Sequence, residues 1–218
     1  MFDPYMSDTF IDGIDTCSIT FGSGKLEGVF GKDKVQIGDG VSIDDQSLGL
    51  TTSQKVFDDS FDCIIGLAYP KMAAKFKQSG ERHVPVFDSV IEQGLLASNV
   101  FAFSMAMRGE LGSELTIGWI DETKYTGEIV WHDVVLQNFW SLTLDKVTLS
   151  FSGGDKDEIL MTICDKDGGK ACLVTPDSGT SSMTFPSWAF HELEGALSAT
   201  GANPKMPCPP SFELLTLT

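Results

Sequence analysis

Short apolar segments separated by tight turns constrain the fold of this chain more than any other feature. Between Ser18 and Ile43 four of them follow one another closely: SITF, LEGVFG, DKVQIG and VSI. This spacing leaves no room for a crossover helix between strands, so it predicts antiparallel hairpins. ELTIGWI, GEIVW, FWSLTLDKVTLSF and CLVT continue the pattern along the chain. The fold is therefore expected to be mainly β.

Two helices are predicted from their end signals. The first lies in PVFDSVIEQG, with Pro85 at its start, Val86, Val90 and Ile91 on one face, and Gly94 at its end. The second lies between Pro186 and Gly201, and its predicted apolar stripe consists of Trp188, Leu193, Ala196 and Leu197.

Size and charge limit the possible functions. The chain has 218 residues, 42% of them hydrophobic, which is enough for one large or two small globular domains. The formal net charge of -16 disfavours a nucleic-acid-binding surface, because phosphate contacts need clustered Lys and Arg. No apolar run is long enough to span a membrane. The first residues, MFDPYMSDTF, lack the pattern of a signal peptide, so we expect either a chain that is not exported or one whose N-terminus lies further upstream.

The cysteines and histidines show no metal-site spacing, so we expect neither a metal nor a cofactor. Cys164 and Cys172 flank a turn of a size that could bring them within disulfide reach, although the spacing also allows two free thiols. Cys17 and Cys63 lie in apolar segments and are expected to be buried thiols, which leaves Cys208 without a partner. The histidines are expected to be solvent-facing or hydrogen-bonded structural residues: His83, His132 and His191.

The segment VTPDSGTSSMTF contains the strongest candidate for chemistry. Asp177 follows a strand-like segment and precedes Ser178, Gly179 and Thr180. Glycine at 179 would let its amide approach and hydrogen-bond the carboxylate. An ordinary Asx turn explains an isolated Asp-Ser-Gly-Thr equally well, so the surrounding sequence must decide.

That sequence resembles the pepsin-like aspartic proteases. The resemblance covers almost the whole chain and is carried, in family order, by SITFGSGKLEGVFGKDKVQIG, FDCIIGLAYP, GSELTIGWIDETKYTGEIVWHDVVLQNFW and PDSGTS. It implies a bilobed β fold with one catalytic aspartate from each lobe and a hairpin flap over a bound peptide. Residues 1–120 resemble most of the N-terminal lobe with the flap. Residues 121–218 resemble the inter-lobe connection and the first part of the C-terminal lobe.

The resemblance also implies roles for individual residues. Asp177 matches the second catalytic aspartate, Gly179 its turn glycine, Ser178 a hydroxyl that bonds to the other lobe, and Thr180 a hydroxyl beside the carboxylate. The flap and apolar cleft positions fall on Phe21, where the family usually has Tyr, and on Gly22, Ser23, Phe57, Phe61, Ile64 and Phe139. Without the resemblance, such aromatic residues are more often simply core.

One departure from the family pattern bears on activity. The first catalytic motif normally precedes a segment like MFDPYMSDTF, which here opens the chain, and Asp15-Thr16-Cys17 lacks the motif's glycine. The fold is therefore expected to be incomplete at both ends, and the 218-residue chain alone is expected to be inactive, because the mechanism needs two carboxylates that share a proton.

The leading hypothesis is thus an aspartic endopeptidase represented by an incomplete chain. The alternatives are a non-catalytic peptide-binding relative of the same fold, a dimer that supplies Asp177 twice, and an unrelated β-sandwich binding protein. For the full-length protein we expect a monomer with peptide or protein substrates. We expect it in the secretory pathway, in an acidic vacuole-like or lysosome-like compartment or outside the cell.

Overall fold

The computed structural model describes residues 2–21, 24–55, 61–77, 79–107, 109–152, 157–169, 171–199 and 216–217. The chain divides into two compact units, Met1–Val130 and Trp131–Thr218. Strands in both units pair antiparallel, which confirms the mainly β prediction. No helix within the described ranges has the length and apolar character needed to cross a membrane.

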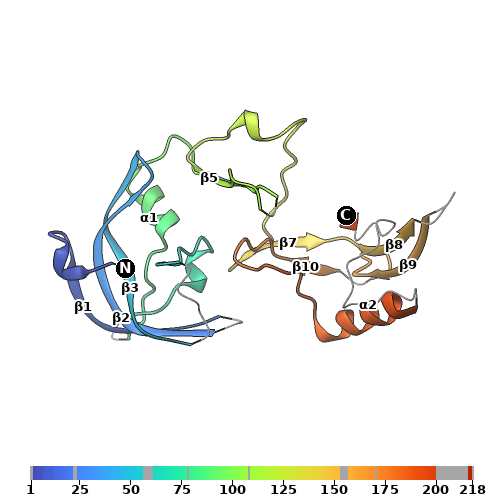
Figure 1. Ribbon diagram of the computed structural model, residues 1–218, viewed down its shortest axis with the longest axis horizontal. Coiled ribbons are helices and arrows are strands. Elements are labelled where there is room, and N and C mark those ends of the chain that lie inside the picture. The colour runs from blue at the N-terminus through green and yellow to red at the C-terminus, as the bar shows by residue number, and fades with distance from the viewer. Residues whose placement is uncertain are drawn as a thin grey trace. The chain divides into compact units, whose positions relative to one another are not determined.

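A meander of three long strands forms the larger of the two described sheets of the first unit (Figure 1). Its strands are β1 (Ile11–Phe21), β2 (Gly24–Ile37) and β3 (Val41–Lys55). The predicted segments LEGVFG and DKVQIG are one continuous strand, β2, and not two. The pairing of β2 with β3 continues without a break from Gly31 to Asp33, where the two segments meet, and the register shifts lie within the segments, between Glu27 and Gly28 and between Asp33 and Val35.

Helix α1 (Val86–Glu92) begins and ends as its sequence signals predict. Pro85 is the N-cap residue, and Gly94 adopts a φ of 65°, a left-handed conformation that ends helices without steric cost for glycine. Phe87 and Val90 are buried, and the ring of Phe87 packs edge-on against Phe101 at 4.9 Å between centroids. Phe101 belongs to β4 (Phe101–Ser104), which pairs with β5 (Glu114–Ile117).

Three short 3-10 turns complete the helical content of the described residues in the first unit: Pro4–Met6, Pro70–Met72 and Glu122–Lys124. The prediction of a strand at GEIVW (127–131) is wrong, because these residues are irregular and exposed. Its apolar residues suit a strand, but they pair with no strand among the described residues, and a strand forms only where a partner satisfies its backbone.

Short strands and one helix make up the described part of the second unit. One sheet has the order β10-β7-β6 and the other the order β11-β8-β9. The strands are β6 (Leu136–Gln137), β7 (Trp140–Leu144), β8 (Val147–Ser152), β9 (Asp157–Ile163), β10 (Cys172–Val174) and β11 (Thr216–Leu217). The core of this unit is a buried cluster to which both sheets and the helix contribute: Leu144, Val147, Ile163, Cys164 and Ala189.

Helix α2 (Ser187–Ala199) covers this cluster with Ala189, which is 1% exposed. Trp188 was predicted to lie on the apolar stripe, but its side chain is 42% exposed, so that assignment is wrong. Ala189, one residue later, takes the inward position in its place. Leu193, Ala196 and Leu197 are partly buried and continue the face that Ala189 begins.

The cysteines divide into three environments. Cys164 and Cys172 form a disulfide with a Cα–Cα distance of 5.3 Å, so of the two alternatives left by their spacing the bridge is the one found. Cys17 is buried as predicted, and burial raises the pKa of its thiol. The prediction of a buried Cys63 is wrong, because that thiol is exposed in the irregular segment before Gly66. Cys208 lies outside the described residues.

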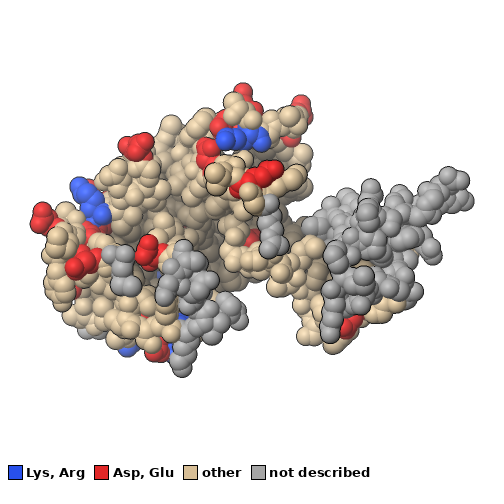
Figure 2. Space-filling view, in the orientation of Figure 1, with Lys and Arg blue, Asp and Glu red and all other residues tan. Residues whose placement is uncertain are grey.

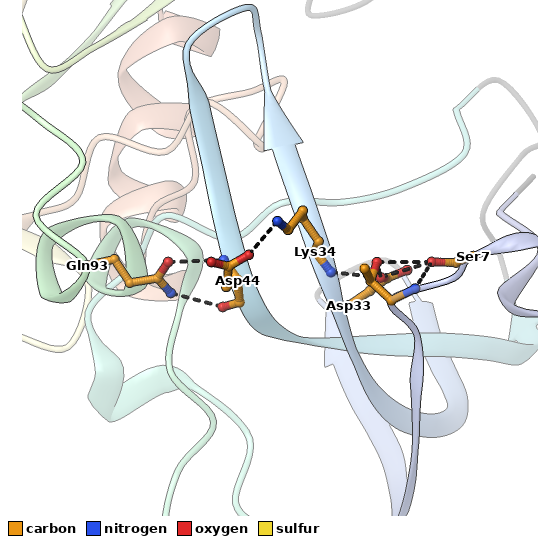
Figure 3. A network of polar contacts seen from close by, with 6 residues as sticks. Ser7, Asp33, Lys34, Asp44 and Gln93 are labelled. Carbon is orange, nitrogen blue, oxygen red and sulfur yellow. Dashed lines mark hydrogen bonds and ion pairs between the residues drawn. The ribbon is translucent and has the colours of Figure 1, made fainter.

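A polar network joins the start of the chain to the sheet and to α1 (Figure 3). The carboxylate of Asp33 accepts hydrogen bonds from Ser7 Oγ at 3.0 Å, from Thr9 Oγ1 at 2.5 Å and from the backbone N–H of Lys34 at 2.7 Å. The ammonium of Lys34 in turn pairs with Asp44 at 2.9 Å. The segment before β1 is therefore fixed to the β2 bulge by a buried carboxylate.

Candidate functional site

Asp177 lies on an exposed turn that follows β10, and its carboxylate is engaged at both oxygens. Oδ1 accepts a hydrogen bond from the Gly179 N–H at 2.9 Å, and Oδ2 accepts one from the Thr180 hydroxyl at 2.5 Å. The Thr180 N–H also donates to the Asp177 carbonyl at 3.2 Å, which closes the turn. The hydrogen bond predicted between Gly179 and the carboxylate is thus present. Donors to both oxygens fix the orientation of the carboxylate.

Glycine at position 179 leaves room for the carboxylate. A Cβ built there would lie 3.2 Å from Asp177 Oδ1, a tight contact. A side chain at this position would require the carboxylate to shift by a few tenths of an ångström. Glycine at position 179 therefore favours both this turn and this orientation of the Asp177 carboxylate.

Strand β10 holds this turn against β7. Cys172, Leu173 and Val174 pair with Leu144, Thr143 and Leu142. Beyond the last pair, the hydroxyl of Thr175 lies 3.2 Å from Oγ of Ser141, a residue only 4% exposed. None of the family motifs in the sequence includes Ser141. Its burial depends on strand pairing that no local pattern reveals.

The predicted flap is a tight hairpin in the first unit. β1 and β2 pair from Ile11 to the end of the hairpin, where Phe21 stands opposite Gly24. Two residues therefore connect the strands, as in the commonest hairpins. Those residues, Gly22 and Ser23, lie outside the described residues, so their predicted role as flap-tip groups remains a prediction.

The apolar positions assigned to the cleft are half-exposed where the structure describes them. Phe61 is 48% exposed and Ile64 47%, both in the first unit, and Phe139 is 45% exposed in the turn between β6 and β7. Phe57 lies outside the described residues. Aromatic and aliphatic side chains left this open are available for contact with an apolar ligand, and their assignment to a substrate cleft remains a prediction.

Asp15 does not form a second turn of the Asp177 kind. It lies within β1, is 8% exposed, and its Oδ1 accepts a hydrogen bond from the Lys77 backbone N–H at 3.3 Å. Asp15 is thus a buried acid in a strand, whereas Asp177 is exposed on a turn.

Acidic side chains are scattered over the face of the molecule shown in Figure 2, and the basic ones on that face stand among them. Several basic residues form ion pairs, including Lys25 with Glu27 and Lys124 with Glu114 at 2.7 Å. Among the described residues no group of three or more His, Cys, Asp or Glu side chains is arranged as a metal site. The Asp177 turn is therefore the strongest candidate for the functional site.

Comparison with known proteins places the chain in a family. The family model "Eukaryotic aspartyl protease" matches residues 1–209. Chymosin from Ovis aries is 36% identical over 202 residues, chymosin from Callithrix jacchus 37% over 204, and pepsin A from Sus scrofa 34% over 202. Each alignment covers 91% of this chain and 48% of the relative, so the chain spans about half the length of the curated relatives it matches. The chain belongs to the eukaryotic aspartyl protease family.

Proposed function

We propose that this chain contributes the flap hairpin and one catalytic aspartate, Asp177, to an aspartic endopeptidase. The observation that carries the proposal is the Asp177 turn, in which both carboxylate oxygens are held by Gly179 and Thr180 while the side chain stays exposed. The same contacts also occur in Asx turns that serve structure alone. The match of residues 1–209 to the aspartyl protease family supports a catalytic role for this turn.

The proposed mechanism requires a second carboxylate close to Asp177. Two such groups cannot both ionise at short range, so they share a proton. One then takes a proton from water while the other protonates the amide carbonyl of the substrate. Within the 218 residues the Asp-Ser-Gly or Asp-Thr-Gly pattern occurs at 177–179 alone. The 218-residue polypeptide is therefore expected to be inactive by itself, and the partner aspartate must come from sequence outside it.

The remaining parts of the proposal follow from the family and the apolar site residues. Phe21, Phe61, Ile64 and Phe139 would contact a peptide or protein substrate on either side of a bond between large apolar residues. We propose that the full-length protein works as a monomer, without cofactor, metal or nucleic acid. Its proposed location is an acidic compartment of the secretory pathway or the outside of the cell, where a proton shared between two carboxylates is retained.

The test is hydrolysis of an apolar peptide at acidic pH by the intact protein and by its Asp177→Asn variant. We expect the substitution to reduce kcat by about 10³-fold or more, because asparagine cannot exchange a proton with water or substrate. Asp121→Asn is the matched control. Asp121 also bonds a backbone N–H and a threonine hydroxyl, both from Thr123, but at a turn without the family motif.

Equal loss of activity in both variants would contradict the assignment of Asp177. An intact protein that binds a statine-type inhibitor but does not cleave peptides would instead be a non-catalytic peptide-binding relative. Inhibitor-sensitive cleavage by the isolated 218-residue chain, lost on Asp177→Asn, would show that a dimer supplies the aspartate twice. Sedimentation of the active species would then measure its size.

A further inference from the structure

A buried histidine joins an extended segment to the sheet of the first unit. His83 is 6% exposed and lies between two phenyl rings, Phe30 on β2 at 3.8 Å and Phe76 at 3.7 Å between ring centroids. Its Nδ1 is 2.5 Å from Oγ of Ser47 on β3. Its Nε2 is fully buried and has no hydrogen-bond partner among the described residues.

The described residues between Ala74 and His83, 74–77 and 79–83, belong to a small loop that this histidine closes. The His83 N–H donates to the Ala74 carbonyl at 2.9 Å, and the Phe76 N–H donates to the Glu81 carbonyl at 2.7 Å. Lys75 and Arg82 form an isolated antiparallel bridge. Among the described residues, the loop contacts the sheet through the backbone bond from Lys77 to Asp15 and through His83, which stacks on Phe30 and reaches Ser47. Directly after the loop, Gln46 Nε2 on β3 donates to the Val84 carbonyl at 3.0 Å.

Protonation of His83 is unfavourable in either neutral tautomer. If Nδ1 carries the hydrogen, it donates to Ser47, and protonation adds an N–H at Nε2 that has no acceptor. If Nε2 carries the hydrogen, that group is already unpaired, and protonation of Nδ1 forces the Ser47 hydroxyl to turn its own hydrogen away. Both routes place a charged ring with an unpaired donor in an apolar environment.

The charged groups near the ring shift the pKa of His83 in opposite directions. Burial lowers the pKa of His83, Asp15 on β1 opposes this, and Lys32 on β2 adds to it; the pKa lies below its ordinary value. β3 contributes the neutral Ser47, and the two phenyl faces attract a cation. The charged side chains of the loop itself are exposed: Lys75, Lys77, Glu81 and Arg82.

We propose that His83 makes the loop 74–83 an acid-sensitive latch, which neutral imidazole holds on β2 and β3 and which protonation releases. The unfolded or released segment takes up a proton near the ordinary histidine pKa of ~6.5. The docked segment resists protonation. Docking is therefore complete above about pH 6.5 and is lost progressively as the pH falls below that value. The proposal does not depend on catalysis.

The test is hydrogen exchange of the loop amides in the intact protein, corrected for the intrinsic rate at each pH. Between about pH 7 and about pH 5 the opening constant should rise by up to about tenfold for each pH unit, until the pKa of docked His83 is reached. His83→Phe keeps an aromatic ring between Phe30 and Phe76 but cannot titrate, so its loop protection should not change over this range. His191→Gln, at an exposed histidine of α2, should behave like the wild type.

Unchanged loop protection in the wild type, or an equal loss in His83→Phe, would overturn the latch. If His83→Phe does not fold, a histidine-ring NMR titration of the wild type decides. A His83 midpoint below ~6.5 that coincides with loop opening supports the proposal. A midpoint at or above that value overturns it.

Discussion

The side-chain amide of Gln93 pairs with the main chain of Asp44 much as a second strand would. Its Oε1 accepts from the Asp44 N–H at 3.0 Å, and its Nε2 donates to the Asp44 carbonyl at 2.9 Å (Figure 3). The next residue, Asp45, has a φ of 51°, a left-handed conformation uncommon outside glycine. The C-terminal end of α1 thus supports β3 where its backbone is irregular.

Gln93→Ala is expected to destabilise the protein by about 1–2 kcal/mol, because two hydrogen bonds are lost. Urea unfolding of the intact protein measures the change. Glu92→Ala, at the exposed neighbouring position, is the control and should cost less. Equal unfolding midpoints for the two variants would show that the pairing with Asp44 adds no stability.

Asp33→Asn should also destabilise, by about 1–3 kcal/mol, because it removes the charge that strengthens three hydrogen bonds. Burial raises the pKa of Asp33, but the hydrogen bonds from Thr9, Ser7 and the Lys34 amide outweigh it, and the pKa lies below its ordinary value. Its contribution to stability is therefore present above about pH 4 and is lost as the pH falls through the lower pKa of the folded state.

Unfolding measured as a function of pH checks the Asp33 prediction. The difference in stability between wild type and Asp33→Asn should shrink in acid, and Asp39→Asn, in the exposed turn between β2 and β3, should leave the pH profile unchanged. A difference that is constant down to low pH would show that hydrogen-bond geometry, and not charge, is what asparagine fails to replace.

Thr180→Val tests the hydroxyl that donates to Asp177 Oδ2. Under the proposed function, its loss should reduce kcat of the intact enzyme by about tenfold with little change in KM, which corresponds to ~1.4 kcal/mol. Thr180→Ser keeps the donor and should retain most activity. Peptide hydrolysis at acidic pH provides both constants, and equal activity of the two variants would argue against a role for the hydroxyl.

Replacing both Cys164 and Cys172 by serine should lower stability by about 2–3 kcal/mol, the range expected for a short loop closed by a disulfide. The bridge connects the end of β9 to the start of β10, which leads to Asp177. Thermal unfolding measures the loss. Cys63→Ser, which removes an exposed free thiol, serves as the control. A double variant as stable as Cys63→Ser would refute the prediction.

Helices and turns whose ends carry local signals could be predicted from the sequence. Pro85 and Gly94 delimit α1 because proline and glycine restrict or free the backbone at those positions irrespective of the rest of the fold. The Asp177 turn was predictable for the same reason, since Gly179 and Thr180 lie within hydrogen-bonding reach along the chain. The motifs, in their order along the chain, were likewise enough to identify the family.

Tertiary structure alone decided the features that depend on distant partners. GEIVW has strand-like composition but pairs with no strand in the part of the chain that the structure describes, and Trp188 lies beside the position that faces the core. His83 carries no local mark of burial, because Phe30, Phe76 and Ser47 come together around it only when the sheet and the loop are assembled. The chain thus encodes its turns and helix ends locally, whereas burial and strand pairing arise from contacts between residues far apart in sequence.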